Sequence, residues 1–596
     1  MKRLPLLLTL MLGLVAFGLM SCEKQVEKIV EAPPAIQVTS INYAQADTTI
    51  TQGKTVMFVA SVEAEDTVDV GSLQFKWFAD KGSFKTSSGD TATWVAPGED
   101  GVAKLSVHVT DGSNIAIGSR NVGVNVYTPT ADVYYVGVNE CSQCHNGGTG
   151  GQQYEPWTKT AHADAWATLE ASDHAASYCE PCHTVNQNDT PGNSGFDEVP
   201  TAKFEDVQCE SCHGPGSAHA GGTEASPPNG PLAALDAATC ATCHEGAHHP
   251  YFDEWETSMH AKMDENHAYD LAYCQPCHSG AGFVAAYDQN ESSLFTDAGS
   301  DPGNLTCGAC HDSHDATNPG QLRTVAAVTL VENTGQEDGG GLTVEGHGAG
   351  QLCMQCHHAR HAPGSEADPT SEIAAGDAHF GPHHSTQTDV LYGQTGYESV
   401  NSSFTFQSSG HGEIEDACVT CHVHAVPYGE FAADSASVGH TFLPTTAACE
   451  PCHGEISDFS DIMAKRDYDN DGDIEGIQDE VVGLIDTLAA KMVEADTTPG
   501  DTLVGANADP DTVLAHLDGM TATTALAVEL RKAGWNLSYV DNDASHGVHN
   551  PAYVIELLQQ SILFLDPNWL TESEKQKVLF QESRATTLPV LAFTAK

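Results

Sequence analysis

The sequence is poor in aromatic and basic side chains. Of its 596 residues, 7% are Phe, Trp or Tyr, and 24 Lys and Arg stand against 82 Asp and Glu, so the formal net charge is −58 at pH 7. Such a polyanion is poorly suited to bind nucleic acid or an anionic lipid surface. The acidity favours solubility, or else long-range attraction of cationic partners or positively charged mineral.

Large aliphatic side chains and unassigned cysteines are scarce as well. Leu, Ile and Val are thinly spread between residues 140 and 460. Of nineteen cysteines, eighteen belong to nine copies of Cys-x-x-Cys-His between Cys141 and His453, which leaves only Cys22. A disulfide framework is therefore excluded. The paired cysteines are Cys141/Cys144, Cys179/Cys182, Cys209/Cys212, Cys240/Cys243, Cys274/Cys277, Cys307/Cys310, Cys353/Cys356, Cys418/Cys421 and Cys449/Cys452. The motif histidines are His145, His183, His213, His244, His278, His311, His357, His422 and His453.

The spacing of this motif suits c-type haem. Two cysteines three residues apart lie on one side of a helical turn, where both can form thioethers to one porphyrin, and the next residue places its imidazole under the iron. A single Cys-x-x-Cys also occurs in zinc knuckles and redox disulfides. Nine copies, each followed by His, predict nine covalent haems, or one for about 35 residues. This region should not fold without its cofactor, because most of its interior is then porphyrin.

The second axial ligand of each iron separates electron transfer from catalysis. Thirty histidines are present, enough to give every iron two. Abundance alone assigns no ligand, because a lone histidine is usually a surface or core residue. His108, for example, alternates onto the face opposite Leu105 and Val107 in a predicted strand, so we expect it to be exposed.

Several segments between about 130 and 565 resemble multihaem c-type cytochromes related to hydroxylamine oxidoreductase, cytochrome c nitrite reductase and the tetrahaem cytochromes of ammonia oxidisers. The similar segments are the His244-x-Gly246-x-x-His249-Pro250 run, Trp255-x-x-Ser258-x-His260, Trp157-x-x-Thr160-x-His162, Cys212-His213-Gly214-Pro215-Gly216-Ser217-Ala218-His219, Cys310-His311-Asp312-Ser313-His314, Gly381-Pro382-His383-His384, Gly439-His440 and Ser545-His546-Gly547-Val548-His549. The resemblance implies distal ligands at His162, His219, His249, His260, His314, His383, His440 and His549, with His347 or His411 as the ninth.

The first 35 residues are typical of a leader and a tether. Lys2 and Arg3 precede an apolar run from 4 to 20, and no second anchor follows, which indicates a secretory signal rather than a spanning helix. Leu-Met-Ser-Cys at 19–22 resembles a bacterial lipoprotein box, which implies a signal peptide at 1–21 and a lipidated Cys22 that begins a tether at 22–35. The alternative is an ordinary signal peptide with an incidental cysteine. With the lipid, the chain is expected at the outer membrane, on its periplasmic or cell-surface face.

Residues 36–128 contain short alternating runs separated by Gly, Asp and Ser. The runs at 55–59, 73–77, 105–109 and 122–126 predict half-buried strands, and together they indicate a small antiparallel sandwich. Trp77 and the Trp94-Val95-Ala96-Pro97-Gly98 stretch resemble immunoglobulin-like or PKD-like modules of bacterial surface proteins. We interpret this module as a spacer or docking surface.

Residues 461–596 lack cysteine and begin with an acidic loop. Asp467, Asp469, Asp471, Asp473 and Glu475 stand at the alternate positions of a calcium loop, with Gly472 at the turn. Position twelve is Gln478, so the bidentate ligand is missing unless Asp479 or Glu480 replaces it. The alternative is an acidic turn that precedes a helix. Apolar spacing predicts helices at 476–495, 523–535 and 551–564.

The sequence thus predicts a multidomain chain. An all-β immunoglobulin-like sandwich (36–128) precedes a mainly α and irregular nonahaem cytochrome c domain (129–460) and a C-terminal helical region packed on it (461–596). The first functional hypothesis is a lipid-anchored electron conduit that serves other cytochromes, a porin–cytochrome complex or an extracellular acceptor such as mineral. The second is an oxidoreductase acting on a small nitrogen or sulfur compound at one open haem, although no Cys-x-x-Cys-Lys variant occurs. The third is a surface structural or filament subunit.

Overall fold

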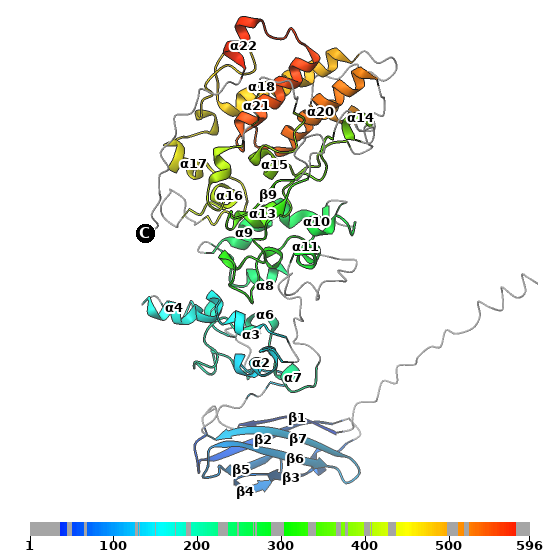
Figure 1. Ribbon diagram of the computed structural model, residues 1–596. Helices are drawn as coiled ribbons and strands as arrows, with labels where there is room; N and C mark the ends of the chain where they lie inside the picture. Colours follow the sequence, from blue (N-terminus) through cyan, green and yellow to red (C-terminus); the bar gives the residue numbers. More distant parts are fainter. Residues whose placement is uncertain are drawn as a thin grey trace, which may run out of the picture. The chain divides into compact units, whose positions relative to one another are not determined.

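The computed structural model describes much of the chain between 36 and 579. The described residues are 36–43, 50–64, 68–124, 129, 131–148, 151–172, 175–185, 192–224, 236–246, 249–265, 268, 271–287, 303–331, 341–364, 371–375, 380–398, 404, 406, 408–426, 437–496, 510–517 and 524–579. The expected signal peptide, Cys22 and the tether lie outside them. Two compact units make up the chain (Figure 1): one reaches to Asp132 and includes Pro191–Asn193, and the other contains Val133–Thr190 and the chain from Ser194.

The first unit contains two antiparallel sheets in its described part. One has the strand order β1-β2-β5-β4 and the other β3-β6-β7. The strands are β1 (Ile36–Tyr43), β2 (Thr55–Ala64), β3 (Gln74–Ala79), β4 (Ser83–Ser88), β5 (Thr91–Val95), β6 (Gly101–Thr110) and β7 (Ile115–Val124). Alternate side chains form the core, where Phe58, Trp94 and Leu105 are fully buried. His108 lies on the other face of β6, 4.6 Å from the Phe78 ring centroid.

The described part of the second unit up to residue 460 consists of short helices joined by turns and irregular segments. None of those described there exceeds eight residues, and the apolar side chains form several small clusters instead of one core. The helices are α2 (Val138–His145), α3 (Tyr154–Trp157), α4 (Ala165–Ala171), α5 (Glu180–His183), α6 (Cys209–His213), α7 (Ser217–Ala220), α8 (Ala237–Ala241), α9 (Tyr251–Thr257), α10 (Gln275–His278), α11 (Gly280–Tyr287), α12 (Cys307–Cys310), α13 (Gly350–Met354), α14 (Glu372–Ala375), α15 (Gln387–Tyr392), α16 (Cys418–His422) and α17 (Thr446–His453). A two-stranded ladder joins β8 (Val328–Thr329) to β9 (Thr343–Val344).

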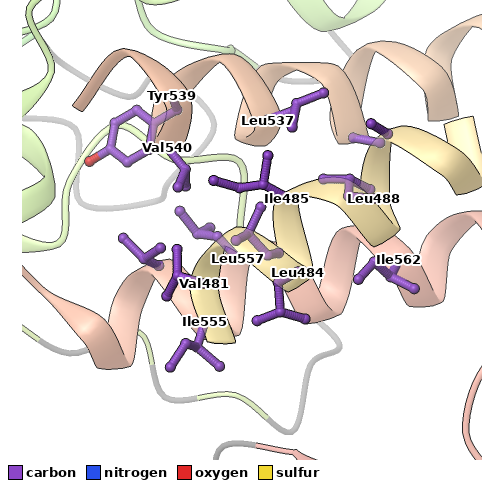
Figure 2. Close-up of a cluster of buried hydrophobic side chains, with 14 of the residues drawn as sticks. Val481, Leu484, Ile485, Leu488, Leu537, Tyr539, Val540, Ile555, Leu557 and Ile562 are labelled. Atoms are coloured by element: carbon purple, nitrogen blue, oxygen red, sulfur yellow. The ribbon is translucent and has the colours of Figure 1, made fainter. Parts of the chain in front are cut away.

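Longer helices follow, and three of them form most of one hydrophobic core (Figure 2). They are α18 (Ile477–Ala495), α20 (Ala525–Asp543) and α21 (Pro551–Leu565), accompanied by α19 (Pro510–Leu517), which contributes Val513 and Leu517 to this core, and by α22 (Glu572–Val578). Leu484 of α18, Leu537 of α20 and Leu557 of α21 are fully buried together. Helix α20 continues past the predicted end at 535 to Asp543.

Polar contacts tie α20 to the chain around 371–398, so these helices belong to the same unit as the cysteine motifs. The Trp535 indole donates to the Thr395 carbonyl at 2.9 Å, and the Arg531 guanidinium donates to the Ile373 carbonyl at 2.8 Å. Across the described ranges, no helix is both long and apolar enough to cross a membrane.

Candidate haem-binding sites

The nine motifs, numbered 1 to 9 in chain order, each form one tight turn. In motif 2 the N–H groups of Cys182 and His183 both donate to the Cys179 carbonyl at 3.2 Å, and motifs 4, 5 and 7 repeat this pattern. The turn places the two sulfurs and the histidine on one side of the backbone. All eighteen motif cysteines are free thiols here, which stand in for the thioether sulfurs of attached haem.

Two of the predicted attachment residues, Cys144 and Cys452, are exposed, whereas the other sixteen motif cysteines are partly buried. They are the second cysteines of the first and last motifs. Cys141 interacts with Cys209 of motif 3, and Cys449 and Cys452 both interact with Cys421 of motif 8.

Eight motif histidines each face a second histidine from elsewhere in the chain. The pairs are His145 with His219 (site 1), His213 with His314 (site 3), His244 with His162 (site 4), His278 with His383 (site 5), His311 with His440 (site 6), His357 with His260 (site 7), His422 with His549 (site 8) and His453 with His411 (site 9). The ring centroids in every pair are 6.1 to 6.3 Å apart.

This narrow range of separations fits an iron between the two rings. The angle between the ring planes varies from 3° at site 3 to 83° at site 7, so ring stacking does not set the distance. An iron bound at about 2 Å by two nitrogens, each about 1.2 Å from its ring centre, would hold the centroids about 6.3 Å apart. The donor set of two sulfurs and two imidazoles therefore fits a c-type haem at these eight sites.

The other nitrogen of many of these rings has a hydrogen-bond acceptor. Nδ1 of His311 lies 2.7 Å from the Gly320 carbonyl, that of His422 2.8 Å from the Phe442 carbonyl, and that of His411 2.7 Å from the Val548 carbonyl. An acceptor at Nδ1 fixes the tautomer that leaves Nε2 free to bind a metal. Burial lowers the pKa of His244, His260 and His383 to about 4, which keeps these imidazoles neutral.

Contacts between cysteines of different motifs give the order of the sites. The closest pairs are Cys141 with Cys209 (sites 1 and 3), Cys182 with Cys243 (2 and 4), Cys240 with Cys307 (4 and 6), Cys277 with Cys356 (5 and 7) and Cys353 with Cys418 (7 and 8). Longer-range interactions join Cys212 to Cys243 (3 and 4), Cys310 to Cys356 (6 and 7) and Cys421 to Cys449 (8 and 9). The sites thus follow the order 1, 3, 4, 6, 7, 8 and 9, with site 2 beside site 4 and site 5 beside site 7.

Three of the facing histidines come from one repeated local structure. Thr160, Ser258 and Ser409 are buried residues in extended conformation, with φ of −76° to −79°. Each is followed by a 3-10 helix that carries the histidine two positions later: η2 (Ala161–Asp164) with His162, η4 (Met259–Glu265) with His260 and η8 (Gly410–Glu413) with His411. Ser/Thr-x-His is therefore a sequence pattern that these three histidines share, although Ser172-x-His174 and Ser217-x-His219 also match it.

The same pattern separates the two alternatives for the ninth distal histidine. His411 faces the motif histidine of site 9, whereas His347 accompanies Tyr392, whose hydroxyl lies 2.8 Å from its Nε2. The Ser409-Gly410-His411 match to the Ser/Thr-x-His form was the available signal.

Site 2 has a motif histidine whose Nδ1 lies 3.1 Å from the Ala165 carbonyl. His183 and His249 both interact electrostatically with His244, whose pKa is lowered chiefly by burial and further by these neighbours. The structure thus places the predicted ligand His249 near His244 of site 4, which is also a neighbour of His183 of site 2.

The acidic loop before α18 gathers a different set of carboxylates from the one predicted. Oxygens of Asp467, Asp469 and Glu480 lie within 4.8 Å of one another, and Asp471, Asp473 and Glu475 are outside this group. Glu480 comes from the first turn of α18, two positions after Gln478, and is 1% exposed. Burial, followed by the neighbouring carboxylates, raises the pKa of Asp469 to about 6. Three carboxylates this close suit a hard cation such as calcium.

Family models match two parts of the chain. Cytochrome c554 and c-prime matches residues 140–214, which hold motifs 1 to 3, and cytochrome c552 matches residues 400–570, which hold motifs 8 and 9. The C-type polyheme cytochrome OmcB of Geobacter sulfurreducens, from two strains, is 23% identical over 355 residues, an alignment that covers 54% of this chain. The same alignment covers 40% of OmcB, so the chain spans about two fifths of the length of these relatives.

A solved conjugative transposon lipoprotein from Bacteroides eggerthii DSM 20697 aligns with 15% of this chain and 96% of its own, at 11% identity. The TM-score of 0.12 is too low to support any conclusion on fold. The family matches and the polyhaem relative instead agree with the motifs, since all of them describe covalently bound c-type haem.

Proposed function

We propose that this chain, a multihaem c-type cytochrome that transfers electrons, is a conduit that passes them through nine covalently bound haems. A bound haem supplies a one-electron redox centre, and two histidine ligands keep its iron six-coordinate in both oxidation states. The observation that carries the proposal is the set of eight histidine pairs with ring centroids 6.1 to 6.3 Å apart. At these eight sites, two histidines per iron would leave no position for a substrate.

The contacts between motifs support transfer along the whole series. Every motif has a cysteine that interacts with a cysteine of at least one other motif, from Cys141 of site 1 to Cys449 of site 9. Sites 4 and 7 each join three neighbours, so sites 2 and 5 form side branches. Cys144 and Cys452 are exposed at the two ends of the series, where a redox partner can approach. Electrons could therefore enter or leave at either end or at a branch.

For site 2 we propose His249 as the distal ligand. The argument is by repetition: site 5 lies beside site 7 and receives His383, which follows motif 7 in the chain. Site 2 lies beside site 4, and His249 follows motif 4. Replacing His249 with Ala should give one high-spin haem in nine, whereas the same change at His347 should give none.

The first test is a low-temperature EPR spectrum of the oxidised protein, with haem counted as the pyridine haemochrome. Nine haems per chain with only low-spin signals are expected. A high-spin signal near one haem in nine that shifts on addition of nitrite, hydroxylamine or a small sulfur compound would overturn the conduit. It would instead make the protein an oxidoreductase with relay haems.

The N-terminal unit fits a spacer or docking module of the immunoglobulin-like kind. Its sheet orders, β1-β2-β5-β4 and β3-β6-β7, correspond to the ABED and CFG sheets of an immunoglobulin constant-type domain. Such a module would hold the haem-bearing unit away from its anchor, with other cytochromes, a porin–cytochrome complex or an extracellular acceptor as partners.

The proposed anchor is a lipid on Cys22, which would place the protein at the outer membrane. Its support is the Leu-Met-Ser-Cys segment at 19–22 after a short basic and apolar leader. Labelled palmitate should be incorporated into the wild type and lost in Cys22→Ala, which should be released from the membrane fraction. Equal labelling of both proteins would exclude this anchor.

A further inference from the structure

At site 8, the hydrogen-bond partner of the distal histidine is the carboxylate of Asp543. Its carboxylate is fully buried, and Oδ1 lies 2.6 Å from Nδ1 of His549, the histidine that faces His422. The second oxygen, Oδ2, accepts from the Ser545 hydroxyl. At site 8 the partner of Nδ1 is therefore a charged carboxylate, whereas at His311, for example, it is a neutral carbonyl.

A carboxylate at Nδ1 changes the iron that the ring binds. It draws the Nδ1 proton toward itself, which makes the imidazole a stronger electron donor. A stronger donor and a buried negative charge both stabilise ferric over ferrous iron, and the low dielectric of the interior strengthens the charge effect. Both effects lower the reduction potential of the haem at this site.

Arg360 has the opposite sign and lies at the neighbouring sites. Its Nη2 is 2.6 Å from the sulfur of Cys277 at site 5, and that sulfur interacts with Cys356 of site 7. The charge of Arg360 also acts on the motif histidines His278 and His357. A cation at this place favours the ferrous state and raises the potentials of sites 5 and 7.

Carboxylates near other sites have smaller expected effects. Glu254 accepts from the backbone N–H of His440 at site 6 at 2.7 Å, but the partner of Nδ1 there is the Val438 carbonyl at 3.1 Å. Asp312 lies 3.6 Å from Nδ1 of His314 at site 3, but the Arg323 guanidinium is 3.8 Å from it and balances its charge. Asp389 interacts with Arg360, and its oxygens accept from the Ala359 N–H and the Thr395 hydroxyl, both at 2.6 Å. Asp389 offsets part of the Arg360 charge, so we expect Asp543 to have the larger effect.

We propose that Asp543 makes site 8 the low-potential centre of the chain, that Arg360 raises the potentials of sites 5 and 7, and that electrons therefore pass from site 8 toward site 7. This inference rests on the proposed conduit function and adds a local direction to it. Asp543 and Arg360 are positioning and tuning residues, since each acts through a haem ligand or an attachment sulfur.

The test is a spectroelectrochemical titration of the holoprotein, with the low-spin EPR signals followed in the same samples. Asp543→Asn keeps the shape and an acceptor oxygen but removes the charge, so the lowest-potential component should move upward and one low-spin g-tensor should change. Ser545→Ala should move the same component further downward, because the carboxylate loses a donor. An unchanged lowest component in Asp543→Asn would overturn the assignment to site 8.

Arg360→Gln should lower the potentials of two components, those of sites 5 and 7, and Arg360→Lys, which keeps the charge, should restore most of the difference. Equal titration curves for Gln and wild type would remove Arg360 from the proposal. Haem counts and high-spin content distinguish a failure of the proposed conduit function from a failure of the tuning by Asp543 and Arg360. An open high-spin iron in the wild type would overturn the conduit, whereas nine low-spin haems with unmoved potentials would overturn only the tuning.

Discussion

The cysteine motifs and the C-terminal helices share one compact unit but are held together by different means. Helices α18, α20 and α21 pack Leu484, Leu537 and Leu557 into one continuous core. From 133 to 460, short turns instead bring histidine pairs together at a constant separation, with small apolar clusters between them. The C-terminal helices fill their interior with apolar side chains, whereas the interior of the region with the cysteine motifs fits haem.

The largest effect expected from this contrast follows loss of haem attachment. The full-length chain, exported by cells unable to attach c-type haem, should lose the structure between 133 and 460, because the porphyrins that fill it are missing. The sheets of 36–124 belong to a separate unit and should stay folded. Limited proteolysis with mass spectrometry measures both regions in one sample, and protection throughout 133–460 without haem would contradict the comparison.

A second effect should be confined to the helical core. Leu484→Ala removes a fully buried side chain of α18, which should cost about 2 to 5 kcal/mol of unfolding free energy. Val482 on the same helix is 38% exposed, so Val482→Ala is the matched control and should cost under about 1 kcal/mol. Denaturant unfolding followed by far-UV circular dichroism gives both values. Equal losses in the two variants would mean that this core does not stabilise the unit.

How much the sequence predicts differs between these two parts for a physical reason. Apolar spacing predicts three helices because a helix buries one periodic face. The same apolar spacing ends the second helix at 535, because the remaining helical turns of α20 bury polar side chains. Asn536 exchanges hydrogen bonds with the Tyr397 backbone, and the Tyr539 hydroxyl donates to the Gln394 carbonyl. Polar residues that form hydrogen bonds with a distant segment produce no hydrophobic periodicity in the sequence, so the predicted helix ends too early.

The residues that attach a haem can be predicted from the local sequence, whereas the pairing of each motif with its distal histidine cannot. The five residues of each motif contain all the information for two thioethers and one ligand. Which histidine faces which motif depends on the path of the chain between them, as for His422 and His549. The resemblance supplied a set of histidines but no pairing, and it left His347 and His411 open. A repeated local structure, in which Ser or Thr precedes a 3-10 helix that carries the histidine two positions later, accompanies three of the facing histidines but does not specify their partners.

The motif sequence also does not predict which of the attachment cysteines are exposed. Cys144 and Cys452 stand in the same five-residue pattern as the other motif cysteines, yet only these two are exposed. They belong to motifs 1 and 9, which stand at the ends of the spatial order of the sites. That order depends on contacts between motifs distant in sequence, such as Cys141 with Cys209.

Single ligand changes should sharpen the pairing. His260→Ala removes the ring that faces His357, so one haem in nine should become high-spin while the other eight keep their spectra. His347→Ala is the control, because that ring accompanies Tyr392. EPR and magnetic circular dichroism of the two oxidised proteins measure the difference. A high-spin haem in the His347 variant, or none in the His260 variant, would mean that the pairs are assigned wrongly.

The smallest effect is expected at the acidic loop before α18, which lies in the chain between the last cysteine motif and the C-terminal helices. Calcium bound only by the folded loop should raise the thermal midpoint of the helices by mass action. Asp469 belongs to the carboxylate group with Asp467 and Glu480, whereas Asp473 does not. Asp469→Asn should therefore abolish the calcium-dependent shift, and Asp473→Asn, which removes the same charge elsewhere in the loop, should leave most of it. Equal calcium responses in the two variants would favour a solvated acidic turn, with Glu480 accepting backbone hydrogen bonds from Tyr468 and Glu475 as its whole role.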